Sequence, residues 1–245
     1  MIHPTPLIIL HTLKYSESSL LVYAYTNLFG RQTYLLRGVR SAKNHSAAAH
    51  FFPLNILDAE VSHKVGANMQ YIKEYRAINP LNGIRTNPNK SAIALFLGEL
   101  LYKSVKEEEA NDLLFHFLVE SILSLNDLTC SVANFHLYFL AKFCAKLGIA
   151  PLPNFHPEHA PHFDVTQGIF VPPNTHTHSD TLFTQQESHL FAKLCTLTSA
   201  AEAASIPLNG AQRHQFVLQI IHYLHYHLGV SLDVKSPDVL RQLFQ

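Results

Sequence analysis

Residues 20–39 read LLVYAYTNLFGRQTYLLRGV, and this stretch decides the fold. Its first part, Leu20–Thr26, is rich in β-branched and aromatic residues, which favour extended backbone. The run Asn27–Gly30 has the composition of a turn, and Thr33–Val39 is a second strand-like segment. The stretch therefore predicts two consecutive β-strands joined by a tight turn.

Three more strand-like segments lie around this pair. Leu7–Tyr15 precedes it and ends at a serine-rich turn, while Leu54–Lys64 and Met69–Ala77 follow it. Five strands in fewer than eighty residues, with short turns and one long connection at 40–53, are typical of a small barrel. We therefore expect a five-stranded OB-fold β-barrel over residues 1–80.

The apolar residues adopt a helical period after residue 80. Stripes at helical spacing run over 93–101, 114–125, 135–147 and 216–228. The run Thr184–Glu187 reads as a capping box, which predicts another helix. Ser236 as an N-cap followed by Pro237 predicts a last short helix.

One region interrupts this helical part. Between His156 and His178 the chain carries five histidines and several prolines, which exclude a continuous helix. The sequence thus predicts an α+β protein with two domains. These are the OB-fold barrel at 1–80 and a mostly α-helical domain at 81–245, which contains an irregular Pro/His-rich insertion at about 150–180.

The charges balance over the whole chain but not along it. Residues 1–90 carry ten Lys/Arg and four Asp/Glu, whereas residues 91–245 carry eight Lys/Arg and fourteen Asp/Glu. A basic part joined to an acidic part indicates that the first part binds a polyanion. Chance segregation of surface charge is the alternative.

The cysteines and the apolar runs bear on the compartment. The chain has three widely spaced cysteines, Cys130, Cys144 and Cys195. Because this number is odd, we expect no disulfide framework and a reducing environment. The first residues lack the pattern of a signal peptide, and no apolar run approaches the length of a membrane span. We expect a soluble, cytoplasmic protein that makes no membrane contact.

The basic part concentrates its charge beside a strand. Gly30–Lys43 contains four basic residues and no acidic one, and its loop carries Arg37, Arg40 and Lys43. Such a loop suits a phosphate backbone better than a small polar substrate. An ordinary solvated surface loop is the alternative.

The last strand of the predicted barrel adds aromatic rings to these cations. We expect Tyr71, Lys73 and Tyr75 to alternate onto one face, where rings stack on bases and the cation pairs with phosphate. In the alternative, both tyrosines fill the barrel core and Lys73 lies along them with its head in water. The predicted DNA-binding residues are Arg31, Arg37, Arg40, Lys43, Lys64, Tyr71, Lys73 and Arg76.

The order of several segments resembles the RecO family of bacterial recombination-repair mediator proteins. These segments are Lys14–Val22, Tyr25–Arg31, Leu36–Ser41, Phe52–Leu54, Lys90–Tyr102 and Phe163–Gly168. They occur in collinear order and span nearly the whole chain.

This resemblance implies an N-terminal OB-fold and a C-terminal helical domain. Proteins of the family bind single- and double-stranded DNA and anneal complementary strands. With RecR they help load the RecA recombinase onto DNA coated by single-stranded DNA-binding protein. They have no known catalytic centre, so the resemblance implies a protein that is not an enzyme and uses no cofactor.

The histidines raise the question of a metal. Many members of the resembled family carry a four-cysteine zinc site in the region of the Pro/His-rich insertion, and this chain lacks those cysteines. Two histidine pairs flank the segment 163–170 instead, and four imidazoles are a chemically allowed zinc set. The alternatives are a Pro/His-rich surface loop without metal and a metal-dependent hydrolase. The candidate ligands are His159, His162, His176 and His178.

A partner site is expected on the third helical stripe. Lys142 and Lys146 lie four residues apart beside apolar positions. The resembled family binds the acidic, hydrophobic C-terminal tail of single-stranded DNA-binding protein in its helical domain, and these lysines are the candidates for that contact. An ordinary amphipathic helix with a solvated basic edge is the alternative. A barrel that binds peptide rather than DNA, as a protein–protein adaptor, is the other alternative for the whole chain.

Overall fold

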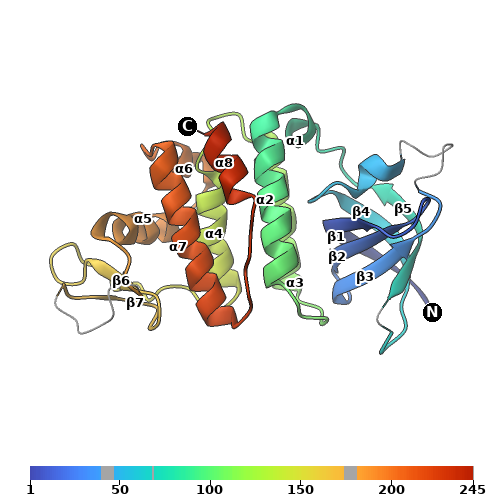
Figure 1. The fold of residues 1–245 in the computed structure, drawn as a ribbon, viewed down its shortest axis with the longest axis horizontal. Helices are drawn as coiled ribbons and strands as arrows, with labels where there is room; N and C mark the ends of the chain where they lie inside the picture. The colour runs from blue at the N-terminus through green and yellow to red at the C-terminus, as the bar shows by residue number, and fades with distance from the viewer. Residues whose placement is uncertain (40–46, 68, 174–180, 245) are drawn as a thin grey trace. The chain divides into compact units, whose positions relative to one another are not determined.

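The computed structural model describes residues 1–39, 47–67, 69–173 and 181–244. The chain divides into two compact units, Met1–Asn126 and Asp127–Gln245, and each is described by itself. Figure 1 gives the order of the elements in both units. The predicted boundary at residue 80 falls inside the first unit, between the barrel and its helices, and it stays a prediction.

The first unit begins with a closed five-stranded barrel, which confirms the predicted OB-fold. Its strands are β1 (Ile2–Lys14), β2 (Leu20–Thr26), β3 (Gly30–Leu36), β4 (Ile56–Ser62) and β5 (Gln70–Ala77). They neighbour one another in the order β1-β2-β3-β5-β4, and β4 closes the barrel on β1. All neighbours are antiparallel except β3 and β5, which run parallel.

Strand β1 starts five residues earlier than its apolar pattern predicts, at Ile2 rather than Leu7. Its first residues pair with β4 alone, and pairing with β2 begins only at Leu7. Pro4 and Pro6 therefore precede the part of β1 that pairs on both sides, and a strand accepts proline at such edge positions. Because proline is uncommon in strands, the sequence did not predict this part of β1.

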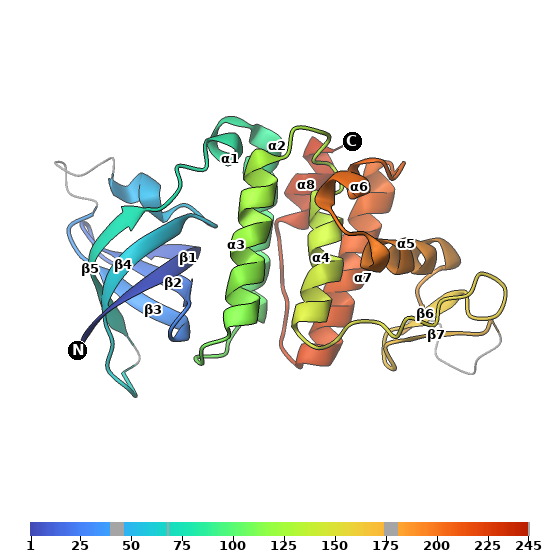
Figure 2. The ribbon, with the colours of Figure 1, turned by 180° about the vertical axis from the view of Figure 1, so that it is seen from behind.

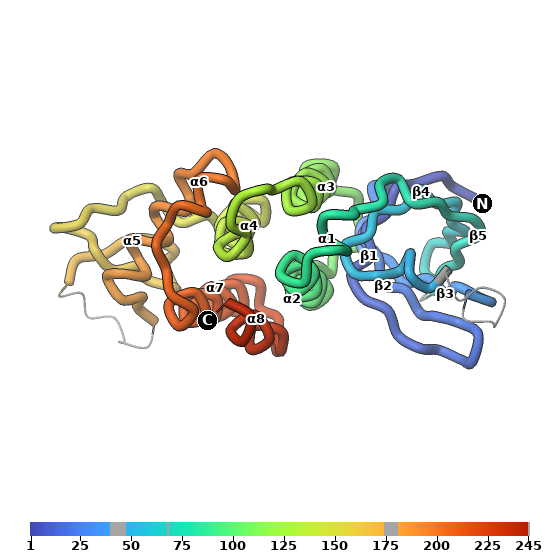
Figure 3. Tube along the Cα trace, turned by 90° about the horizontal axis from the view of Figure 1, so that it is seen from above, coloured from blue at the N-terminus to red at the C-terminus, as the bar shows by residue number. Residues whose placement is uncertain are grey.

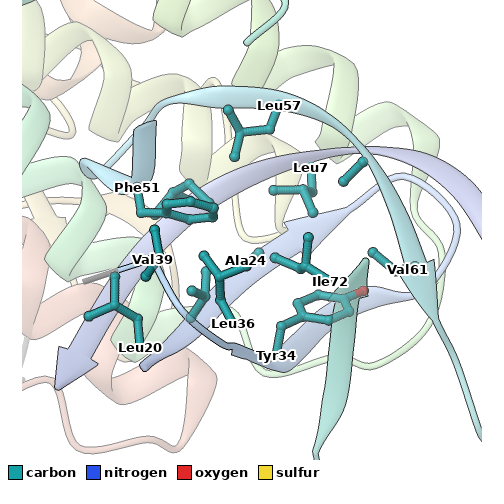
Figure 4. Close-up of a cluster of buried hydrophobic side chains, with 13 residues drawn as sticks. Leu7, Leu20, Ala24, Tyr34, Leu36, Val39, Phe51, Leu57, Val61 and Ile72 are labelled. Carbon is teal, nitrogen blue, oxygen red and sulfur yellow. The ribbon is translucent and has the colours of Figure 1, made fainter. Parts of the chain in front are cut away.

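The barrel is filled by inward-facing side chains from all five strands. Figure 4 shows that Leu7, Leu36, Leu57 and Ile72 converge from four strands. Phe51 joins them from the short 3-10 helix η1 (Ala47–Phe51), which lies in the connection between β3 and β4. The long connection predicted at 40–53 therefore contains a helical turn that contributes to the core.

Three helices complete the first unit, namely α1 (Asn82–Thr86), α2 (Pro88–Ser104) and α3 (Asp112–Asp127). The side chain of Asn87 caps α2 by accepting from two backbone N–H groups. At Gly98 a Cβ would lie 2.8 Å from the Cβ of Pro53, so the glycine lets α2 lie directly against the barrel. Helices α2 and α3 run side by side (Figure 3).

The second unit is mostly helical, as predicted. It contains α4 (Phe135–Lys146), α5 (Gln185–Thr196), α6 (Ala200–Ala204), α7 (Gly210–Leu228) and α8 (Pro237–Leu243). The predicted capping box at Thr184 is present, and α7 ends at Gly229 as expected. The predicted last short helix is present as α8, with Ser236 at the N-cap position and Pro237 at its start, and the Ser236 side chain makes no capping bond.

The Pro/His-rich insertion contains a small hairpin that the sequence did not predict (Figure 2). Strands β6 (His162–Asp164) and β7 (Ile169–Val171) pair antiparallel. Phe163 of β6 is fully buried among aromatic rings of α5 and α7. Three-residue strands are too short to produce a periodic pattern, which is why they escaped prediction.

Across the described ranges, no helix combines the length and apolar character that crossing a membrane requires.

Candidate nucleic-acid interface

A groove opens at the seam between β3 and β5. The two strands share only two register pairs, Tyr34 with Gln70 and Leu35 with Tyr71. Beyond these pairs a groove of about 580 Å³ lies along the seam, and none of the described residues that line it is acidic. Its lining consists of Leu35, Leu36, Arg37, Val39, Tyr71, Ile72, Lys73 and Tyr75.

Two cations and one ring form the polar part of this groove. The guanidinium carbon of Arg37 lies 5.3 Å from the centre of the Tyr71 ring, and Nζ of Lys73 lies 6.0 Å from the same centre. Both cations are exposed, and Tyr71 is half-buried. Cations around an accessible ring suit a nucleotide, because the ring stacks with a base while the cations neutralise phosphates. We call Arg37, Tyr71 and Lys73 the seam cluster.

The expected alternation along β5 is wrong, because the strand is bulged. Glu60 of β4 faces Glu74 while the next residue, Val61, faces Ile72, so Lys73 is the extra residue of a β-bulge. The bulge lets Ile72 enter the core and also turns Tyr75 toward it. The Tyr75 ring packs edge-on against Phe51 at 4.8 Å, and burial raises the pKa of its hydroxyl. The core alternative therefore holds for Tyr75 but not for Tyr71.

Arg31 is placed differently from the other predicted cations. It is only 9% exposed, and its Nη1 donates to the carbonyl oxygens of Tyr102 at 3.0 Å and Val105 at 2.9 Å. Its guanidinium carbon also lies 5.2 Å from the centre of the Tyr23 ring and 4.7 Å from that of Tyr102. Burial lowers the pKa of Arg31. These contacts cap the carboxyl end of α2 and tie it to the barrel, so we leave Arg31 out of the proposed interface.

Arg76 lies on a different face of the barrel. Its Nη2 donates to Oδ2 of Asp58 at 2.8 Å, and both residues line a hollow together with Glu60 and Glu74. Three carboxylates on this face disfavour a phosphate backbone there. The predicted cations Arg40 and Lys43 lie outside the described residues.

Lys64 lies in the β4–β5 turn. Gln70, which sequence analysis missed, holds this turn in place. The backbone N–H of Lys64 donates to Oε1 of Gln70 at 2.9 Å, and Nε2 of Gln70 donates to the carbonyl oxygens of Lys64 at 2.8 Å and Ala67 at 3.3 Å. Gln70 is 3% exposed. A single buried glutamine leaves no pattern in a sequence, so nothing marked it in advance.

The second unit contains another groove, which is apolar. It has a volume of about 630 Å³, and Lys142 lies in its wall, where Nζ donates to the carbonyl oxygen of Cys195 at 2.7 Å. Lys146 is not among its lining residues, whereas Lys193 is, and sequence analysis missed Lys193. Burial raises the pKa of the Cys195 thiol to about 11. The lining is Ala141, Lys142, Ala145, Ala150, Pro151, Leu152, Pro153, Phe155, Phe170, His189, Ala192, Lys193, Cys195 and Thr196.

The histidine candidates are only partly described. The rings of His156 and His159 stack at 4.4 Å, and Nδ1 of His162 lies 3.1 Å from the carbonyl oxygen of Phe183. His176 and His178 lie outside the described residues. In the part of the chain that the structure covers, no group of three or more His, Cys, Asp or Glu side chains could hold a metal ion.

Comparison with known proteins gives the family. Residues 1–81 match the family described as "Recombination protein O N terminal", and residues 85–236 match "Recombination protein O C terminal". The chain is 33% identical over 248 residues to the DNA repair protein RecO of Azobacteroides pseudotrichonymphae genomovar. CFP2, with 100% of both chains covered. It is 34% identical over 245 residues to the DNA repair protein RecO of Bacteroides fragilis, again with 100% of both covered. It is 34% identical over 242 residues to that of Flavobacterium psychrophilum, with 98% of both covered. The two grooves are thus features of a chain that belongs to the recombination protein O family of DNA repair proteins.

Proposed function

We propose that this chain is a non-enzymatic mediator of recombinational repair that binds DNA through the seam cluster. The observation that carries the proposal is the placement of two exposed cations around the half-buried ring of Tyr71, in a groove whose described lining is free of acidic side chains. Base stacking on such a ring contributes about 1–3 kcal/mol per base and tolerates any sequence.

The same cluster accounts for binding to both single and double strands. Arg37 and Lys73 neutralise phosphates, and phosphates are available on either form of DNA. Tyr71 adds a stacking contact only where bases are unpaired. Neutralised phosphates also repel a second strand less, which favours the annealing of complementary strands.

The apolar groove of the second unit suits a peptide. Its wall offers alanine, proline, leucine and phenylalanine side chains, with Lys142 and Lys193 as the cations. Apolar pockets joined to cations match a peptide that is both hydrophobic and acidic. This supports docking of the C-terminal tail of single-stranded DNA-binding protein in this groove. Cooperation with RecR and loading of RecA complete the proposed role, and they rest on membership of the family.

Fluorescence anisotropy of a labelled single-stranded oligonucleotide tests the DNA site. Native chain is titrated at several salt concentrations beside an Arg37→Ala/Lys73→Ala variant. Each phosphate contact contributes about −0.7 to the slope of log affinity against log salt, so loss of both cations flattens the slope by about 1.4. A Lys14→Ala/Arg85→Ala variant removes two exposed cations elsewhere in the same unit and leaves the slope unchanged.

Two results would count against the proposal. Native chain without measurable affinity at low salt would reject DNA binding altogether. Equal losses in the two double variants would reject the seam cluster as the site.

A further inference from the structure

The turn between β4 and β5 carries an apolar side chain that is not part of the barrel core. Ala67 N–H donates to the carbonyl oxygen of Lys64 at 3.2 Å, and Gly66 at the third position has a φ of +75°. This is the geometry of a type II turn, in which the glycine is required by its positive φ. Val65 occupies the second position and is 89% exposed. Neither the turn nor the core explains a β-branched apolar residue there.

The turn holds Val65 in a defined position. The side chain of Gln70 bonds to the N–H and the carbonyl of Lys64 and to the carbonyl of Ala67. Since Gln70 is buried and is the first residue of β5, these bonds tie the turn to the strand. Val65 therefore projects from a turn that β5 holds.

Val65 follows the level of Tyr71 along the β4–β5 hairpin. Ser62 of β4 faces Tyr71, so Val65 lies three residues beyond that ring in the chain. An extended chain covers about 3.3 Å per residue, so the separation along the hairpin is at most about 10 Å, or about three base-pair steps of about 3.4 Å. Lys64 adds an exposed cation, and residues 61–73 contain no acidic side chain.

We propose that Val65 is a wedge that packs on the last base pair of a duplex at the point where a single strand leaves it. This inference rests on the proposed function of the seam cluster, which holds the single strand. Apolar side chains act as wedges against base steps in other DNA-binding proteins, where unstacking is offset by added contact. Lys64 neutralises a phosphate beside the same step. The chain then recognises a junction of single-stranded and duplex DNA, rather than either form alone.

The test compares three probes on the full chain: a single-stranded oligonucleotide, a duplex with a single-stranded tail, and a blunt duplex. The last base pair at the junction carries 2-aminopurine, whose fluorescence rises when it unstacks. Val65→Ser is expected to weaken binding to the tailed duplex about fivefold and to abolish the fluorescence rise, while affinity for the single strand stays within about twofold. Leu28→Ser is the matched control, because Leu28 is an exposed apolar residue in the β2–β3 turn.

The outcomes separate this inference from the function on which it rests. Native chain that binds none of the three probes overturns the proposed DNA site, and the wedge with it. Native chain that binds the single strand, with Val65→Ser equal to native on the tailed duplex, overturns the wedge alone. Equal losses for Val65→Ser on all three probes, or an equal loss for Leu28→Ser, also overturn it.

Discussion

The two grooves of this chain are nearly equal in size and opposite in chemistry. The seam groove of the barrel measures about 580 Å³, and the groove of the helical unit about 630 Å³. The first places two exposed cations around a ring, and the second is mainly apolar with two lysines in its wall. Volume therefore says little about the ligand, whereas the arrangement of charge distinguishes the proposed DNA site from the proposed peptide site.

The two grooves also differ in how they are held. The seam groove lies along a parallel strand pair that shares only two register pairs. The helical groove depends on α4 and α5, which a lysine–carbonyl bond joins directly across its wall. A substitution that weakens the packing around one groove should therefore leave the other groove intact.

The largest effect is expected from Arg31, which ties α2 to the barrel of the first unit. Arg31→Met removes the buried cation that donates to the carbonyls of Tyr102 and Val105, and it leaves Tyr102 with Lys106 as its remaining side-chain donor. The expected cost is about 3 kcal/mol in the free energy of unfolding of the first unit. Hydrogen exchange along a urea titration measures the two units separately, and the helices α4–α8 should keep their protection.

The control is Arg37, which follows strand β3, whereas Arg31 lies within that strand. Arg37→Met removes an exposed cation, so it should change stability by less than about 0.5 kcal/mol. Equal destabilisation by the two substitutions would mean that the contacts of Arg31 do not fasten α2 to the barrel.

The second effect concerns acid and the helical unit. His136 on α4 is 2% exposed, and burial lowers its pKa from 6.5 to about 3. Below pH 6.5 the unfolded chain takes up a proton that the folded chain excludes, so the free energy of unfolding falls as the pH drops from 6.5 toward 3. The loss by pH 5 is about 2 kcal/mol, because each unit is worth about 1.36 kcal/mol. Acid should therefore destabilise the unit that contains the helical groove through His136.

Urea titrations at pH 7 and pH 5 check this, with His136→Gln beside the native chain. The variant has no imidazole at this position. The decrease in the free energy of unfolding of α4 between pH 7 and pH 5 should therefore be smaller than in the native chain by most of the ~2 kcal/mol that His136 contributes. Comparing each protein with itself removes any direct cost of the substitution. If the decrease in unfolding free energy between pH 7 and pH 5 is unchanged in the variant, a group other than His136 causes the acid sensitivity.

Local patterns account for what the sequence predicted correctly. Five strands and the main helices follow from apolar period, turn residues and caps, all of which act within a few residues. Tyr71 and Lys73 could be proposed as DNA-binding residues on the same kind of local signal, since cations and rings gather in short segments.

Pairing across the fold accounts for what was missed. The bulge at Lys73 depends on the register of β5 against β4, which no property of β5 alone determines. Arg31 appeared to be a surface cation because its carbonyl partners lie 71 and 74 residues away in the chain. The helical groove draws its lining from residues 141 to 196, so only the folded chain brings Lys142 and Lys193 to one wall.

The smallest of these effects tests the helical groove through the two lysines singled out by the sequence. Lys142→Ala should weaken binding of a labelled acidic, hydrophobic tail peptide about tenfold, since a charge-assisted contact in a partly buried wall is worth about 1.5–3 kcal/mol. Binding of an oligonucleotide to the seam groove should not change. Lys146→Ala is the control, because Lys146 is on the same helix but outside the groove lining. An equal loss for both variants would show that the peptide follows the exposed edge of α4. A loss in oligonucleotide binding would show that the two grooves serve one ligand, and the contrast between them would then lose its functional meaning.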